Sequence, residues 1–152
     1  MKALKTITAT LAVFMVTAEA QGADCKWLGR SFWEAATPDM VADCASEEAY
    51  ATARGKFGET PLHWAVEFGT FGTVQALLAS GMDIEAKDQS GWRPLHWAVV
   101  FGTPGTVRAL LESGANVNAR TENGETPLYW AKNYSVPETI EALLNRGAQE
   151  EG

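Results

Sequence analysis

Residues 59–65 read Glu-Thr-Pro-Leu-His-Trp-Ala, and close copies of this stretch occur twice more in the chain. Residues 93–98 read Arg-Pro-Leu-His-Trp-Ala, and residues 126–131 read Thr-Pro-Leu-Tyr-Trp-Ala. The three copies follow one another at steps of 33 residues, without insertion or deletion. A fixed period of this length is typical of an array of stacked structural units, in which each unit contacts only its neighbours.

Positions outside the motif keep the same step. A glycine precedes each copy, a second glycine closes each unit, and between them lies an apolar i, i+3, i+4 pattern that predicts one buried helix face. Threonine followed by proline is a favourable helix start, so each unit is expected to hold an inner helix beginning at that proline and an outer helix after it. These periodic positions are Gly58, Gly91 and Gly124; Gly81, Gly114 and Gly147; Val74, Val107 and Ile140; and the leucine pairs 77–78, 110–111 and 143–144.

With this Thr-Pro-Leu-His-x-Ala motif and period, residues 27–148 resemble the ankyrin repeat family. The resemblance implies an all-α repeat solenoid of stacked helix-turn-helix units whose connecting loops project as β-hairpins. We expect residues 59–152 to form three repeats with a C-terminal cap, and residues 21–58 to form a degenerate N-terminal capping repeat. Val41 and Cys44 stand one period before Val74 and Leu77, which places them in the core of that first unit.

The N-terminal 20 residues have the pattern of a cleaved secretory signal. A basic start with Lys2 and Lys5 precedes a mostly apolar run, and Ala18-Glu19-Ala20 is a small-x-small cleavage motif. The apolar run is shorter than the ~20 residues of a membrane span. A buried N-terminal helix is the alternative. The compact signal and small domain favour a bacterial host, and hence a periplasmic or secreted protein with no membrane attachment after cleavage.

Net charge and cysteine content extend this interpretation. Cleavage after residue 20 leaves 10 basic and 18 acidic residues, a net charge of −8, which argues against nucleic acid as a partner. Cys25 and Cys44 are the only cysteines, and an oxidising compartment favours a disulfide between them. Two unpaired buried thiols are the alternative. We expect the mature protein to be a monomer.

The two histidines, His63 and His96, suggest structure rather than chemistry. A zinc site needs further ligands within about 2 Å of the metal, and no cysteine or third histidine completes a set. In ankyrin repeats this histidine hydrogen-bonds the motif threonine and the neighbouring loop. His63 has Thr60, whereas His96 has Arg93, so only half of that pattern carries over. The sequence contains no recognisable catalytic triad and no phosphate-binding glycine loop, so we expect neither enzyme activity nor a cofactor.

Aromatic residues also recur with the period. Phe68, Phe101 and Tyr134 stand near the end of each inner helix, where the resemblance implies a concave groove that contacts partners. They are either groove residues or side chains that fold back into the core. The tryptophans of the motif replace a usual leucine and are expected in the core; they are Trp64, Trp97 and Trp130. The other expected contact residues, on the loops and inner helices, are Phe57, Glu59, Glu67, Trp92, Val100 and Asn133.

A protein-binding module that acts through the concave face, inhibiting or stabilising its partner, is the function this pattern favours. Aromatic residues are enriched at the energetic centres of protein interfaces. Binding of a glycan or of the cell wall is the alternative, because aromatic ladders also stack on sugars. An enzyme is the third class considered.

Expression with the complete N-terminus tests the export interpretation. Intact mass spectrometry of the exported chain should show a mature protein that begins at Gln21. Its mass should be two hydrogens below the fully reduced value, because the Cys25–Cys44 disulfide has formed. A purified chain that keeps Met1, or that takes up alkylating reagent on both thiols without reduction, contradicts the interpretation.

Overall fold

The structure is a computed structural model that describes residues 34, 36–45, 50 and 52–149. The expected signal segment and Cys25 lie outside these residues, so cleavage and the disulfide stay predictions. Within the described part, helices begin and end close to the predicted positions. They are α3 (Pro38–Ala45), α5 (Pro61–Phe68), α6 (Phe71–Ala79), α7 (Pro94–Phe101), α8 (Pro104–Glu112), α9 (Pro127–Tyr134) and α10 (Pro137–Asn145).

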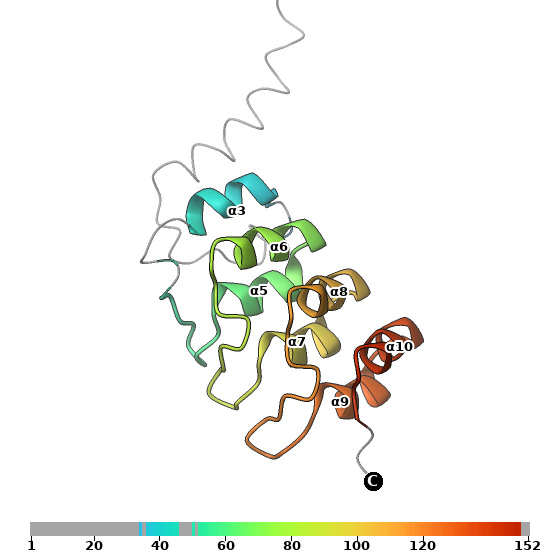
Figure 1. Cartoon of the computed structure of the whole chain (residues 1–152). Helices are drawn as coiled ribbons and strands as arrows, with labels where there is room; N and C mark the ends of the chain where they lie inside the picture. The colour runs from blue at the N-terminus through green and yellow to red at the C-terminus, as the bar shows by residue number, and fades with distance from the viewer. Residues whose placement is uncertain (1–33, 35, 46–49, 51, 150–152) are drawn as a thin grey trace, which may run out of the picture.

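The helices form two rows, as Figure 1 shows. Helices α5, α7 and α9 make the inner row, and α3, α6, α8 and α10 make the outer row. Each helix packs against the next one in its own row, and each inner helix packs against the outer helix that follows it. This arrangement confirms the predicted all-α repeat solenoid.

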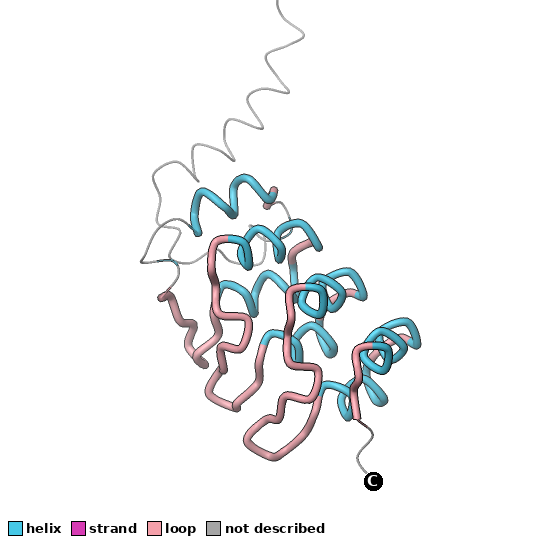
Figure 2. The backbone as a smooth tube through the Cα atoms, viewed as in Figure 1, coloured by secondary structure: helices cyan, strands magenta, loops and turns pink. Residues whose placement is uncertain are grey.

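The long loops between an outer helix and the next inner helix lie on one side of the array (Figure 2). They turn back as hairpins would, with the Asp88 N–H donating to Trp92 O at 2.9 Å, but the described residues form no β-strand. One reason is that the Asp88 carboxylate takes the Ser90 and Trp92 amides, at 2.8 and 2.9 Å. Gly91 has φ of 76°, and a Cβ there would lie 2.7 Å from the Glu122 side chain of the next loop. The loops therefore touch one another at a position that only glycine fits.

Each helix has only eight or nine residues, and isolated helices shorter than about 12–15 residues are marginal in water. Threonine caps support the ends: Thr70 and Thr103 exchange hydrogen bonds with the threonine three residues later. Arg93 stands at the cap position of α7 and provides no side-chain cap. Its guanidinium instead lies 3.0 Å from Glu85 Oε2, in an ion pair without hydrogen-bond geometry, and donates to the Arg120 carbonyl at 3.1 Å.

The core lies between the two rows, and the periodic valines and leucines fill it. Leu77, Leu110 and Leu143 are fully buried, and so are Val74 and Val107. The first unit also packs as predicted. Its core positions Val41 and Cys44 have exposed fractions of 0% and 3%.

The last helix pair leaves open a face that earlier pairs cover. Leu144 is 43% exposed, whereas Leu111, one period earlier, is 4% exposed. Tyr129 is 46% exposed, whereas His63 and His96, at the same position of earlier units, are buried. Within the described residues no further unit follows α10 to cover these side chains.

Truncation of one leucine in each environment tests the stacked arrangement. Leu110→Ala should lower the free energy of unfolding by about 2–5 kcal/mol, because it leaves a cavity between two neighbouring units. Leu144→Ala, the same change one repeat later at an exposed position, should cost less than about 1 kcal/mol. Urea unfolding followed by circular dichroism measures both. Equal losses contradict the assigned burial.

Candidate functional site

Aromatic side chains from all three inner helices and one loop make a connected surface, here called the aromatic strip. Each inner helix contributes a tryptophan and a second aromatic four residues later, which a helix places on the same face. The ring centroids within these pairs are 5.9, 5.5 and 5.6 Å apart. The members of the strip are Trp64, Phe68, Trp92, Trp97, Phe101, Trp130 and Tyr134.

Three ring contacts join the three helices into one strip. The rings of Trp64 on α5 and Trp97 on α7 have centroids 6.4 Å apart. Trp92, on the loop before α7, lies 6.3 Å from Phe101 and 4.8 Å from Trp130 on α9. Since no direct ring contact between Phe101 and Trp130 is present among the described residues, Trp92 bridges the two helices.

The strip is only half-buried. Phe101 is 50% exposed and Tyr134 is 62% exposed, while Phe68 is half-buried. The prediction that the three motif tryptophans belong to the core is wrong. All three are half-buried, packing against the core on one side and reaching the surface on the other. Helical spacing was the signal that could have shown this: a residue four positions before an exposed aromatic shares its face.

Of the loop residues proposed as contacts, Trp92 belongs to the strip, whereas Phe57 and Glu59 lie apart from it. Phe57 is 58% exposed and lies beneath the Lys56 amine, with 5.5 Å from Nζ to the ring centroid. No ring contact within the described residues joins Phe57 to the strip. Glu59 is only 6% exposed, and its carboxylate accepts the Phe57 N–H at 2.9 Å. Burial therefore corrects the assignment of Glu59: it holds its own loop closed and offers a partner very little surface.

The inner-helix residues proposed as contacts do lie beside the strip. Glu67 and Val100 are half-buried and precede strip aromatics by one residue. Asn133 is exposed, and its side-chain amide donates to the Tyr129 carbonyl within α9 at 3.0 Å. These three residues remain candidates for partner contact.

Carboxylates on the loops near the strip are occupied by neighbouring groups. Asp88 accepts the Trp97 indole N–H at 2.9 Å through its second oxygen. Glu122 lies 3.7 Å from the Lys87 amine, and Glu125 accepts the Thr121 hydroxyl at 3.2 Å. The oxygens of Asp88 and Glu125 are therefore engaged by neutral donors, and within the described residues Glu122 is the one of the three carboxylates with a cationic neighbour.

The buried histidines have the structural role that was expected. His63 Nδ1 accepts the Thr60 N–H at 3.1 Å, so the proton is on Nε2, which donates to Trp92 O at 3.2 Å. His96 repeats this with the Arg93 N–H and with Glu125 O, at 3.2 and 3.3 Å. Desolvation by burial lowers the pKa of His63, and it lowers the pKa of His96 to about 4, because its effect exceeds that of the hydrogen bonds to backbone carbonyls, which raise the pKa.

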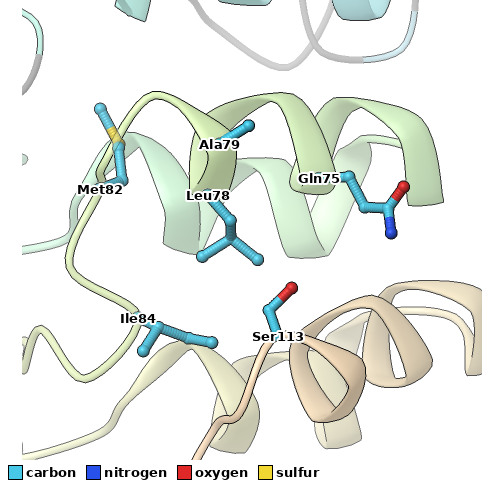
Figure 3. A pocket seen from close by; sticks show the side chains of 6 residues that line it. All are labelled: Gln75, Leu78, Ala79, Met82, Ile84 and Ser113. Atoms are coloured by element: carbon cyan, nitrogen blue, oxygen red, sulfur yellow. The ribbon is translucent and has the colours of Figure 1, made fainter.

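A shallow depression of about 470 Å³ lies between the ends of the outer helices α6 and α8 (Figure 3). Its lining is mainly apolar: Gln75, Leu78, Ala79, Met82, Ile84 and Ser113. In the described part of the chain, no set of three or more His, Cys, Asp or Glu side chains is placed to bind a metal. No described helix has both the length and the apolar character needed to cross a membrane.

The repeated geometry agrees with the comparison against known families. A family model described as ankyrin repeats, in three copies, matches residues 34–121, more than half of the chain. The chain belongs to the ankyrin repeat family. No curated protein matches the sequence. Helices α9 and α10 lie beyond the matched segment and continue the same packing. Ankyrin repeats are typically protein-interaction modules rather than enzymes.

The buried imidazoles predict a specific acid sensitivity. The pKa of His96 is about 4 in the folded chain against 6.5 for the free group. The contribution of neutral His96 to the free energy of unfolding is therefore complete above pH 6.5 and is lost as the pH falls toward 4. Over this range the loss is on the order of 3 kcal/mol for a full shift of this size. Urea unfolding of the native chain and of His96→Gln at both pH values measures the difference.

His96→Gln should be less stable at neutral pH, yet its stability should fall less steeply on acidification, since the carboxylates that also titrate are common to both proteins. His63→Gln serves as the matched variant in the preceding unit. Parallel pH profiles for the native chain and both variants would show that the buried imidazoles contribute nothing to acid sensitivity.

Proposed function

We propose that this ankyrin array binds a protein partner through the aromatic strip on its inner-helix side. The observation that carries the proposal is the continuity of the strip. Half-exposed rings from three successive units and one loop are in contact from Phe68 to Tyr134. Ankyrin repeats are typically protein-interaction modules, and exposed aromatic clusters of this kind supply large contact areas in interfaces.

The strip suits binding because it exists before a partner arrives. Aromatic side chains have few rotatable bonds, and here each ring is also held by a neighbouring ring. A partner therefore orders little on the array side, which lowers the entropic cost of association. The core beneath is filled by Leu62, Leu95 and Leu128, so stability does not rest on the exposed halves of the rings.

The proposal includes export. The basic start, apolar run and Ala-x-Ala motif support action in the periplasm or outside the cell. There the array would act as a monomer without a cofactor, and covering part of a partner's surface would inhibit or stabilise that partner.

A pair of phenylalanine truncations tests the proposed face. Phe101→Ala removes the central exposed ring of the strip and should weaken partner binding by about 2 kcal/mol or more, as an interface hot spot does. Its free energy of unfolding should change by less, because half of the ring already faces solvent. Phe71→Ala is the control, since Phe71 is 36% exposed at the start of outer helix α6.

The measurement is capture from the compartment in which the protein occurs, with native chain and each variant as bait. A stoichiometric protein retained by native chain and Phe71→Ala, but not by Phe101→Ala, supports the proposal. If the native chain is retained on glycan and captures no protein partner, the result favours the sugar-binding alternative over the protein-binding proposal. Equal loss of the partner with both variants would place the site elsewhere.

A further inference from the structure

The aromatic strip has one feature that narrows the kind of partner. Trp92 stands at a loop position where the units before and after carry Glu59 and Glu125. We propose that the strip binds an uncharged, proline-rich segment in the extended polyproline II conformation, with Trp92 as the central contact. This inference rests on the proposed function and names the chemistry of the partner.

Spacing is the first argument. Neighbouring packed helices are about 8–10 Å apart, and the three inner helices present their aromatic pairs in succession. A polyproline II helix has three residues per turn and rises ~3.1 Å per residue, so one turn advances about 9 Å. A proline-rich segment that crosses the inner helices therefore places one turn on each unit. About six or seven residues reach from α5 to α9 at this rise.

Occupied polar groups are the second argument. A glycan needs many hydrogen bonds, and a basic segment needs free carboxylates. Asp88 is taken by two amides and an indole, and Glu122 is paired with Lys87. Addition of a β-strand is also disfavoured, because the Gln89 amide already donates to Phe57 O of the preceding loop at 2.9 Å. The strip itself offers apolar ring surface, with Glu67 and Asn133 as polar residues beside it.

The indole of Trp130 is the third argument. Its N–H is shielded from solvent and has no hydrogen-bond partner among the described residues, whereas the equivalent N–H of Trp97 donates to Asp88. Thr121 stands at the position equivalent to Asp88. A polyproline II segment has no internal hydrogen bonds, so its carbonyls remain available as acceptors. A small shift of the Trp92 ring, which lies 4.8 Å from the Trp130 ring, would let the indole donate to such a carbonyl.

Trp92 itself is held in place from its backbone. Its N–H donates to Asp88 and its carbonyl accepts from His63 of the preceding unit. The ring bridges α7 and α9 through Phe101 and Trp130. Aromatic-lined grooves recognise proline-rich segments because the ligand is already extended and loses little entropy on binding. The two backbone hydrogen bonds fix the place of Trp92 on its loop, and its side chain supplies the centre of such a groove.

Titration of the full chain with a ten-residue all-proline peptide tests the inference, with the intrinsic fluorescence of the strip tryptophans as the readout. The native chain should show a saturable change. Trp92→Gln, an uncharged form of the glutamate present in the adjacent units, should bind at least tenfold more weakly with an unchanged circular dichroism spectrum. Tyr134→Ala, at the far end of the strip, is a second variant that removes an exposed ring, and Phe71→Ala should bind as the native chain does.

A ten-residue Gly-Ser peptide and a chitin hexasaccharide serve as comparison ligands. A saturable response to the sugar in place of the peptide overturns the inference. So does a result in which Trp92→Gln and Tyr134→Ala both bind the peptide as tightly as the native chain does. No peptide response from a native chain that still captures a protein through Phe101 also overturns it, while leaving the proposed function intact. Failure of both the peptide and the capture experiment rejects the strip as a binding site altogether.

Discussion

The fold depends on a neutral imidazole placed at the start of an inner helix. In the second unit His63 accepts the Thr60 amide and contacts its hydroxyl at 2.8 Å, then donates to the Trp92 carbonyl of the following loop. A single buried ring thus accepts a hydrogen bond from an amide at the start of the helix, contacts the capping hydroxyl and links two units. Burial of such a group without partners would be costly, and His96 makes the corresponding bonds in the next unit, whereas the third copy of the motif carries Tyr129.

This bond connects the core to the surface that we propose binds the partner. The residue that receives it, Trp92, is the one whose side chain joins the aromatic groups of α7 and α9. The backbone of Trp92 is therefore held in part by a fully buried group on the neighbouring unit. In a solenoid, units contact only their neighbours. A hydrogen bond of this kind therefore couples the packing of one repeat to a surface residue of the next.

Sequence alone predicted the repeat architecture because its period and its capping residues act locally. Thr60, Pro61 and Leu62 specify a helix start and a buried position whatever lies around them, and the structure has both. The degenerate first unit was found in the same way, through Val41 and Cys44. The same local rule explains why Arg93, which has no side-chain acceptor, leaves its helix without a side-chain cap, whereas its ion pair with Glu85 depends on packing between loops.

The candidate site was harder to predict because it depends on packing between units. Family resemblance placed the tryptophans in the core, whereas the space between rows is filled by leucine and valine, and the larger rings extend to the surface. Glu59 had the sequence position of a contact residue, but its carboxylate folds onto its own loop. The bridging role of Trp92 depends on distances between two neighbouring units, which no local pattern encodes.

The last helix pair, α9 and α10, is packed on one side only, and Tyr129 and Leu144 remain exposed on its other face. Packing therefore stabilises this pair less than the pairs that have neighbours on both sides. Since a helix pair with one neighbour opens more readily than a pair with two, we expect the amide hydrogens of α10 to exchange with solvent faster than those of α8. Tyr134 lies at the end of α9, within this less protected pair. A ligand that reaches Tyr134 must therefore also hold the last repeat closed, and its affinity includes the free energy of that local closing.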